Sequence, residues 1–381
     1  MMEERAVGCR SAARGHRRHL RVAVTSAVVL SALALAACGS NNDNNSSSSA
    51  GGSATTAGAK GPAGHLTVAT SSLSGDLLNY VADDQGYFKA ENVDVKIMPN
   101  VGANTVPLVS SGQTDLVAYP SITSTVLSSQ GKPTTALYVT VTGGSGGVLA
   151  TNPKKADSIQ KLQGIKGCKI GTFPEGTLAY GTTVTYIQNL KLDCTVTPFQ
   201  DASAMIGGLS SGRVDALVGG YAFFSQAVKA GKAKILIDTT NPQQRAQYVP
   251  SGLPENAFWG LTKTVKAKRA VIIPWLRAID KARTYVADPA NTSQIAKMLI
   301  DKGYAEGMEQ SAVEHDIVDA FRSYLPTGPQ PGYITKEAWD KQLSEAEKWK
   351  VPNFNSKAPT SQYDQAVDMS YYTAALGNKG S

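Results

Sequence analysis

Side chains that could hold a small solute gather in four short stretches of this 381-residue chain. The stretches are residues 71–75, 119–121, 173–177 and 219–221, and they are rich in hydroxyl groups, glycine and tyrosine. Groups of these types bind a ligand through hydrogen bonds, ring contacts and free backbone N–H groups. Together with nearby polar positions, they give the candidate ligand-binding residues Ser71, Ser72, Ser74, Asn104, Tyr119, Ser121, Thr142, Gly176, Thr177, Gly220 and Tyr221.

Each of these candidates also has a purely structural interpretation. The serines could simply cap the helix that follows them. Tyr119 and Tyr221 could be packed surface tyrosines, but they follow equivalent strands, so we favour two rings that contact one ligand from opposite sides. Gly176 and Thr177 begin a helix, where free N–H groups can hold an anionic or polar group.

The four stretches contain no arginine or lysine. A tightly held dianion usually recruits one, whereas a singly charged sulfonate can bind to hydroxyls and helix N-termini alone. Glu175 has two interpretations: facing the ligand it would suit an amine or an aminopyrimidine, and facing solvent it is a first-turn acid. We favour the outward orientation. His65 and His315 lack partners at metal-ligand or nucleophile spacing, so we expect no metal and no catalytic residue.

A repeat of the chain places these stretches. Ser-Ser-Gly at residues 110–112 and 210–212 is followed each time by an aspartate, Asp115 or Asp215, and by a short apolar run. Each copy predicts a helix that ends at the glycine and then a buried strand. We expect both aspartates to hydrogen-bond to the turn rather than to act as acids or bases.

Each half of the chain therefore predicts the order β-loop-α-β-α-β. Alternating strands and helices favour parallel sheets covered on both faces, with ligands bound outside the carboxyl ends of the strands. We expect an α/β fold of two similar Rossmann-like lobes with parallel-rich sheets and a ligand cleft between them. Lobe I should comprise residues 65–145 and 247–381, and lobe II residues 146–246. The glycine-rich crossing at 143–147 could act as a hinge.

The N-terminal segment is typical of export. Residues 1–37 contain six arginines and two acids, so more than half of the net charge of +7 lies there and the remainder is too small to indicate nucleic acid. The apolar run 22–37 is too short for a comfortable transmembrane helix and reads as a signal peptide. It ends at Cys38, in a sequence that resembles the lipobox of bacterial lipoproteins, which predicts lipidation of that cysteine. Residues 38–64 predict a disordered tether.

Two cysteines remain in the globular part of the chain. Cys168 begins one predicted strand and Cys194 directly precedes another. If these strands are parallel neighbours about 4.8 Å apart, both cysteines lie at the same sheet edge, within disulfide reach. Export favours the oxidised form, so we favour a disulfide over two small buried thiols.

Several motifs together resemble one known family. They are the lipobox, the stretch 86–95 (GYFKAENVDV), the two Gly-x-x-Asp copies and the stretch 162–171 (LQGIKGCKIG). They are similar to those of extracytoplasmic solute-binding lipoproteins of ABC importers, in the branch for nitrate, sulfonates, taurine and thiamine precursors. The resemblance implies the type II periplasmic binding protein fold.

The resemblance also implies a function. The chain would be a lipid-anchored monomer on the extracytoplasmic face of a bacterial cell membrane. It would capture a small polar solute (sulfonate-, taurine- or nitrate-like) and deliver it to an ABC permease, without a cofactor or nucleic acid. The alternative solute is a thiamine-pyrimidine or another heteroaromatic precursor. A pyrimidine-precursor synthase on the same fold is a further alternative, but the Cys-rich motif of such fungal enzymes is missing here, so we expect no enzyme.

Overall fold

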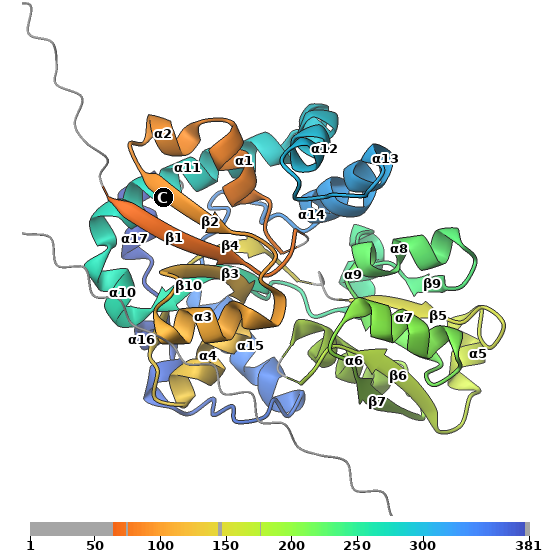
Figure 1. Ribbon diagram of the computed structural model, residues 1–381. Coiled ribbons are helices and arrows are strands. Elements are labelled where there is room, and N and C mark those ends of the chain that lie inside the picture. Colours follow the sequence, from red (N-terminus) through yellow and green to blue (C-terminus); the bar gives the residue numbers. More distant parts are fainter. Residues whose placement is uncertain (1–63, 74, 144–146, 176, 378–381) are drawn as a thin grey trace, which may run out of the picture. The chain divides into compact units, whose positions relative to one another are not determined.

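The computed structural model describes residues 64–73, 75–143, 147–175 and 177–377, which Figure 1 shows as coloured ribbons. The predicted signal peptide, the predicted lipidation site Cys38 and the predicted tether up to residue 63 lie outside the described residues. So do Ser74, Gly176 and residues 144–146 of the predicted hinge. Within the described ranges, none of the helices has the length and apolar character that a membrane crossing needs.

Two five-stranded sheets form the framework. Sheet A has the order β2-β1-β3-β10-β4, and sheet B has the order β7-β6-β8-β5-β9. We call sheet A with its helices lobe I, and sheet B with its helices lobe II; the exact boundaries at residues 146 and 246 stay a prediction. The strands are β1 His65–Thr70, β2 Asp94–Met98, β3 Leu116–Pro120, β4 Thr134–Val141, β5 Val148–Thr151, β6 Cys168–Thr172, β7 Cys194–Pro198, β8 Ala216–Gly219, β9 Lys234–Ile237 and β10 Asn256–Leu261.

The strands of the repeat pair in parallel, whereas β5 and β10, which follow the two crossings between the sheets, pair antiparallel with their neighbours. In sheet A, β1 pairs with β2 and β3 in parallel, and β6 pairs in the same way with β7 and β8 in sheet B. However, β10 runs antiparallel to β3 and β4, and β5 runs antiparallel to β8 and β9. The predicted α/β fold with two similar lobes is confirmed, but each sheet is mixed, because its fourth strand enters directly from the other half of the chain.

Sheet B is buried on both faces, as the alternation of its side chains shows. Ala216 and Val218 of β8 pack with one apolar cluster, which includes Tyr186 of α6 (Leu178–Asn189). Leu217, between them, packs with a second cluster, which includes Met205 of α7 (Ala202–Ser210). Successive residues of a strand point to opposite faces, so α6 and α7 cover opposite faces of the sheet. The other lobe II helices are α5 Ile159–Gln163 and α8 Tyr221–Lys229.

Sheet A carries most of the remaining helices, including those of the C-terminal third. α11 (Arg269–Ala287) contacts α1, α2, α17 and β1, whereas α3 and α4 contact β3 and β10. One large apolar cluster runs through this lobe, with Trp259, Trp275 and Trp339 fully buried in it. The helices are α1 Leu78–Asp84, α2 Tyr87–Ala90, α3 Thr105–Ser111, α4 Ser121–Ser129, α10 Thr262–Ala267, α12 Thr292–Asp301, α13 Gln310–Ala312, the π-helical turn η3 Val313–Asp319, α14 Ala320–Ser323, α15 Lys336–Lys348, α16 Tyr363–Ala366 and α17 Ser370–Leu376, with 3-10 turns η1 Gly102–Asn104, η2 Pro289–Asn291 and η4 Pro359–Ser361.

The return crossing between the sheets contains a short helix. α9 spans Pro242–Tyr248. The Asn241 side chain accepts hydrogen bonds from the backbone N–H groups of Gln243 and Gln244, and Pro242 occupies the first helical position. Asn followed by Pro is an ordinary helix start, so the residues at the beginning of α9 account for this helix.

The two repeated aspartates hold equivalent strand pairs together. Asp115 Oδ2 accepts a hydrogen bond from the N–H of Thr67 (2.8 Å), and the Asp115 N–H donates to the Thr67 carbonyl (2.9 Å). Asp215 makes the same two bonds with Lys169, at 3.0 and 2.8 Å. Each carboxylate also binds a lysine at 2.6 Å, Lys268 in lobe I and Lys155 in lobe II. The aspartates have a structural role, as predicted, but their carboxylates bond to the neighbouring parallel strand rather than to the turn.

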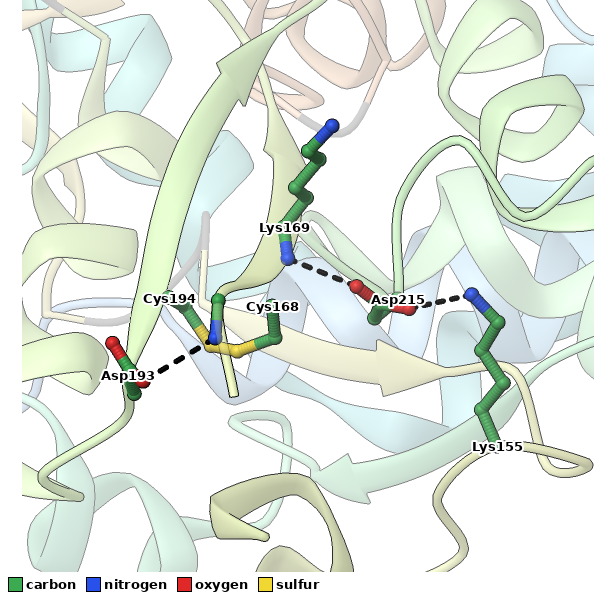
Figure 2. Close-up of a disulfide and its surroundings, with 7 residues drawn as sticks. Lys155, Cys168, Lys169, Asp193, Cys194 and Asp215 are labelled. Atoms are coloured by element: carbon green, nitrogen blue, oxygen red, sulfur yellow. Dashed lines mark hydrogen bonds and ion pairs between the residues drawn. A yellow bond between two sulfur atoms is a disulfide. The ribbon is translucent and has the colours of Figure 1, made fainter. Parts of the chain in front are cut away.

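Cys168 and Cys194 form a disulfide at the start of β6 and β7, the pairing expected from the sequence. The two residues are direct neighbours across the parallel ladder. Figure 2 shows the disulfide beside Asp215, whose carboxylate lies between Lys169 and Lys155. This edge of lobe II is thus held by a covalent bond and by a charged hydrogen-bonded group.

Replacing both cysteines by serine should lower the free energy of unfolding by about 3 kcal/mol, because the disulfide closes a loop of 26 residues in the unfolded chain. Denaturant titrations of the oxidised wild type and of the double serine variant measure the loss. Reduced wild-type protein is the control and should show the same loss. Equal stability of oxidised and reduced protein would contradict the prediction.

Asp215→Ala should destabilise the protein by about 2 kcal/mol, because it removes the acceptor for the Lys169 N–H and the partner of Lys155. Asp215→Asn should cost less, since an amide oxygen can still accept the backbone bond. Asp115→Ala and Asp115→Asn should repeat this order in lobe I. The interpretation fails if asparagine costs as much as alanine at both positions in denaturant titrations.

Candidate functional site

A cavity of about 550 Å³ lies where the carboxyl ends of the strands in both sheets meet. Its walls come from both lobes, as predicted for the strand ends of an α/β fold. The lining residues are Ser71, Ser72, Gly75, Gly102, Ala103, Val106, Tyr119, Pro120, Thr123, Val126, Phe173, Pro174, Glu175, Thr177, Leu178, Ala179, Gln200, Gly220, Phe223, Asn256, Pro352 and Asn353. This volume is that of a small-molecule site.

The lobe I wall is a set of linked loops. The turn after β1 closes on itself through a hydrogen bond from the Gly75 N–H to the Ser72 carbonyl (3.1 Å). The Gly102 N–H donates to the Ser71 carbonyl at 3.1 Å, which joins this turn to the segment after β2. Asn256 of β10 donates from Nδ2 to the Gly75 carbonyl at 3.4 Å. Backbone bonds therefore fix the position of the serines that face the cavity.

The lobe II wall contains two aromatic rings and the N-termini of two helices. The rings of Phe173 and Phe223 lie 5.2 Å apart in a tilted arrangement. Thr177 caps α6: its Oγ1 accepts from the Tyr180 N–H at 3.3 Å. Gly220 precedes α8. The N-termini of α6 and α8 thus lie at the cavity, and the two phenylalanines give it an apolar part of its wall.

The structure brings together some of the predicted site residues and places others elsewhere. Ser71, Ser72, Tyr119, Thr177 and Gly220 line the cavity. Ser121, Asn104, Thr142 and Tyr221 are not among the lining residues. Ser121 is fully buried, and its hydroxyl donates toward the Pro254 carbonyl and Gln342 Oε1.

The other residues away from the cavity have contacts of their own. Asn104 is exposed at the start of α3. Thr142 Oγ1 donates to the Tyr324 carbonyl at 3.3 Å. The Tyr221 ring meets the edge of the His315 ring at 5.4 Å, so the expected pairing of Tyr119 and Tyr221 across one ligand is not the arrangement found.

Sequence reasoning missed several cavity residues, and three of the segments that hold them show why. Gln200 follows β7 as Asn100 follows β2, so the repeat carried a signal for it. Asn256 begins β10, which enters sheet A from a distant part of the chain. Pro352 and Asn353 follow α15, in a helical region that the sequence assigns only to packing on lobe I. No local pattern marks these last residues as part of a site.

Glu175 carries the only charge among the described residues that line the cavity. It is exposed, and its Oε1 accepts a hydrogen bond from Tyr180 Oη (3.2 Å), which is not a lining residue, so the predicted outward orientation of the carboxylate stays a prediction. Burial raises the pKa of Tyr119, which keeps its hydroxyl neutral. Among the described residues, no group of three or more His, Cys, Asp or Glu side chains could hold a metal ion. The walls can therefore provide hydroxyls, amides, aromatic rings and one carboxylate.

Asp76 is a buried carboxyl directly behind the lobe I wall. Its Oδ1 accepts from the Leu78 N–H (2.8 Å) and its Oδ2 from Asn79 Nδ2 (2.7 Å), and the residue is fully buried. Burial raises its pKa from 3.8 to about 6, against the opposing effect of these hydrogen bonds. Asn79 in turn accepts from Trp275 Nε1 at 3.2 Å. This network ties the turn after β1 to the core helix α11.

Solved structures share this architecture, and two of the three described here are binding proteins. A protein of Bordetella bronchiseptica RB50 superposes with a TM-score of 0.63 at 20% identity, over 82% of this chain and 96% of its own. The periplasmic aliphatic sulphonate binding protein SsuA from Escherichia coli gives 0.57 at 15% identity, over 76% and 87%. The periplasmic nitrate-binding protein NrtA from Synechocystis PCC 6803 gives 0.60 at 15% identity, over 82% and 88%. The fold is that of the periplasmic binding proteins.

The family follows from the sequence itself. Residues 77–292, more than half of the chain, match the family described as NMT1/THI5 like, and the chain belongs to that family. No curated protein matches the sequence. The predicted family resemblance and the predicted fold are therefore both confirmed.

The stability of the protein should fall as the pH rises through the titration of Asp76. The folded state binds the proton of Asp76 more tightly than the unfolded state does. The contribution of this proton to the free energy of unfolding is therefore present below pH 3.8 and is lost as the pH passes about 6. The size of the effect is on the order of 3 kcal/mol.

Asp76→Asn removes this titration and is the comparison that isolates it from other carboxylates. The difference in unfolding free energy, wild type minus variant, should decrease as the pH rises across that window. Denaturant titrations of both proteins at several pH values measure it. Parallel curves would contradict the raised pKa.

Proposed function

We propose that this protein is the solute-binding component of an ABC importer, which captures a small organic solute between its two lobes and delivers it to a membrane permease. The observation that carries the proposal is the cavity, whose walls are loops at the carboxyl ends of strands in both sheets. Membership of the NMT1/THI5-like family and the transport proteins among the structural neighbours support it. Among the described lining residues, no nucleophile is paired with a base, which favours binding over catalysis.

The site of action that fits this role is the extracytoplasmic face of a bacterial membrane. The arginine-rich start, the apolar run and Cys38 support export and lipid anchoring, with residues 38–64 as a tether and the folded body acting as a monomer. The disulfide in lobe II also favours an oxidising compartment. Radiolabelled palmitate uptake by the wild type, but not by Cys38→Ala, would test the anchor.

The solute that the cavity fits best has a flat apolar body and a neutral or positively charged polar end. Phe173, Phe223 and Tyr119 offer ring faces, and Glu175 offers a carboxylate. Arginine, lysine and histidine do not occur among the described lining residues, although a bound anion usually recruits such a group. Heteroaromatic amines fall in this class.

A singly charged sulfonate- or nitrate-like anion is the second candidate. The N-termini of α6 and α8 begin at Thr177 and Gly220 on the cavity wall, where free N–H groups can hold an anion. Sulfonate- and nitrate-binding proteins among the structural neighbours also favour it. The sign of charge that the cavity prefers separates the two candidates.

Benzylamine and benzenesulfonate carry opposite charges on the same ring, so they test that sign directly. Benzylamine should raise the melting temperature of residues 64–381, and benzenesulfonate should not. A ligand at 100 times its Kd adds about 2.7 kcal/mol of stability, which a melting curve resolves. Taurine, nitrate and aminopyrimidines complete the panel. A shift with sulfonates alone would reverse the assignment of charge, and no shift across the panel would remove both solute classes.

Glu175→Gln should weaken benzylamine binding by about threefold, because an exposed carboxylate contributes a small, solvent-screened attraction. Glu306→Gln is the matched control, since Glu306 is exposed and lies outside the cavity lining. It should leave the Kd unchanged. Equal Kd values for all three proteins in isothermal titration would exclude contact between Glu175 and the amine.

A further inference from the structure

The segment after α15, near the C-terminal end of the chain, reaches the cavity. Pro352 and Asn353 line it, together with residues of both sheets. α15 itself belongs to lobe I: it contacts α4, and its Trp339 is buried in the lobe I core. The chain after α15 therefore leaves lobe I packing and passes along the binding site.

Trp349, at the start of this segment, is packed against lobe II. Its side chain lies against α6 at Gly181, so closely that a Cβ on Gly181 would fall 2.3 Å from the indole ring. The indole Nε1–H donates to Thr185 Oγ1, also on α6, at 3.0 Å. Only 4% of Trp349 is exposed. A lobe I segment is thus fixed to a lobe II helix by a buried ring and a directed hydrogen bond.

An apolar cluster extends this contact to the cavity wall. It joins Trp349 and Val351 to Ile122 of α4 in lobe I and to Leu178 of α6 in lobe II. Leu178 and its neighbour Ala179 line the cavity, as does Val126 of α4, which packs against the same cluster. Moving Trp349 would therefore disturb the α6 wall even though Trp349 is not itself a lining residue.

The far end of the segment is fixed to lobe I. The Ser129 hydroxyl, at the end of α4, donates to the Asn353 carbonyl at 3.0 Å. Lys350 and Asn353 both have positive φ (52° and 57°), so two left-handed residues turn the chain sharply between its anchors. The segment has a defined course from Trp349 on α6 to Asn353 on α4.

We propose that residues 349–353 are a strap that belongs to the binding site. In this strap, Trp349 is a positioning residue that holds the α6 wall in place, and Asn353 contacts the solute. The structural part, Trp349 holding α6, stands without any ligand. The part that concerns the solute rests on the proposed binding function.

Gly181→Ala tests the strap without altering Trp349 or any lining residue. The new methyl group would occupy the position of the indole and displace it from α6. Gly207→Ala is the matched control: it is also a helical glycine of lobe II, in α7, and a Cβ there meets no atom within 4 Å. Both changes exchange glycine for a better helix former, so they differ in the contact with Trp349.

The first measurement uses the ligand-free protein. Trp259, Trp275 and Trp339 are fully buried in lobe I and give a constant background of fluorescence. Gly181→Ala should shift the emission to longer wavelength, and a Trp349→Phe background should abolish that shift. Amide hydrogen exchange in α6 and in residues 349–353 should become faster, while the core strands of sheet A should not change. Emission and exchange rates equal to those of Gly207→Ala would contradict the proposal that Trp349 holds α6 in place.

The second measurement uses benzylamine and benzenesulfonate. Whichever binds the wild type should bind Gly181→Ala about tenfold more weakly, with most of the change in the dissociation rate. Thr185→Val removes the acceptor of the indole N–H, together with the bond from Thr185 Oγ1 to the Gly181 carbonyl (3.0 Å) within α6. It should act in the same direction with a smaller effect, which covers the case in which Gly181→Ala does not fold. Asn353→Gly keeps the positive φ and should weaken binding without changing the fluorescence.

The two measurements separate the possible failures. If neither compound binds the wild type, the solute classes under the proposed function fail, while fluorescence and exchange still decide whether Trp349 holds α6. If binding occurs and Gly181→Ala loosens α6 but leaves the Kd and the dissociation rate unchanged, Trp349 has only a structural role and the positioning role is overturned. An unchanged Kd in Asn353→Gly removes the solute contact.

Discussion

The paired hydrogen bonds between an aspartate and the neighbouring parallel strand determine the rest of this structure. In both lobes the aspartate that precedes the third strand of the repeat bonds through its N–H and its carboxylate to one residue of the first strand, and a lysine completes the group. A shift of one residue in this pairing would turn every side chain of the strand to the other face. Because the register is fixed at the amino ends, the loops at the carboxyl ends of both sheets have fixed positions. The cavity is built from those loops.

The repeat explains why much of the fold could be predicted from the sequence. The signals in the repeat are local: a helix that ends at Ser-Ser-Gly, then an aspartate and a buried strand. Because these signals occur twice, the order of elements in each half could be predicted. The loops after β1, β3, β6 and β8 followed from the same order, and each contributes residues to the cavity wall. Asn256, Pro352 and Asn353 could not be found in this way, because they reach the cavity through long-range packing that no local pattern encodes. Tyr221 illustrates the limit of the repeat: the sequence places Tyr119 and Tyr221 after equivalent strands, but Tyr119 lies within β3, whereas Tyr221 begins α8 and its ring lies on His315.

The chemistry of the cavity and the identity of the structural neighbours give different expectations about the solute. The neighbours include sulfonate- and nitrate-binding proteins, whereas the described lining here combines aromatic rings, amides and hydroxyls with the carboxylate of Glu175. At 15% identity a shared fold says little about the few side chains that select a ligand. The same backbone can therefore present helix N-termini to an anion in one protein and ring faces to an aromatic solute in another.

The place of β10 in sheet A has a consequence for how the chain acquires its structure. All five strands of sheet B lie within one continuous stretch, residues 148–237, so lobe II has its whole sheet once that stretch is available. Sheet A is different: apart from an isolated bridge between Ala136 and Val367, β4 pairs with β10, which follows more than a hundred residues later. Until β10 is available, β3 and β4 each have an unpaired hydrophobic edge. Such edges favour aggregation or the binding of chaperones. A chain that emerges from its amino end would therefore complete its second lobe before its first.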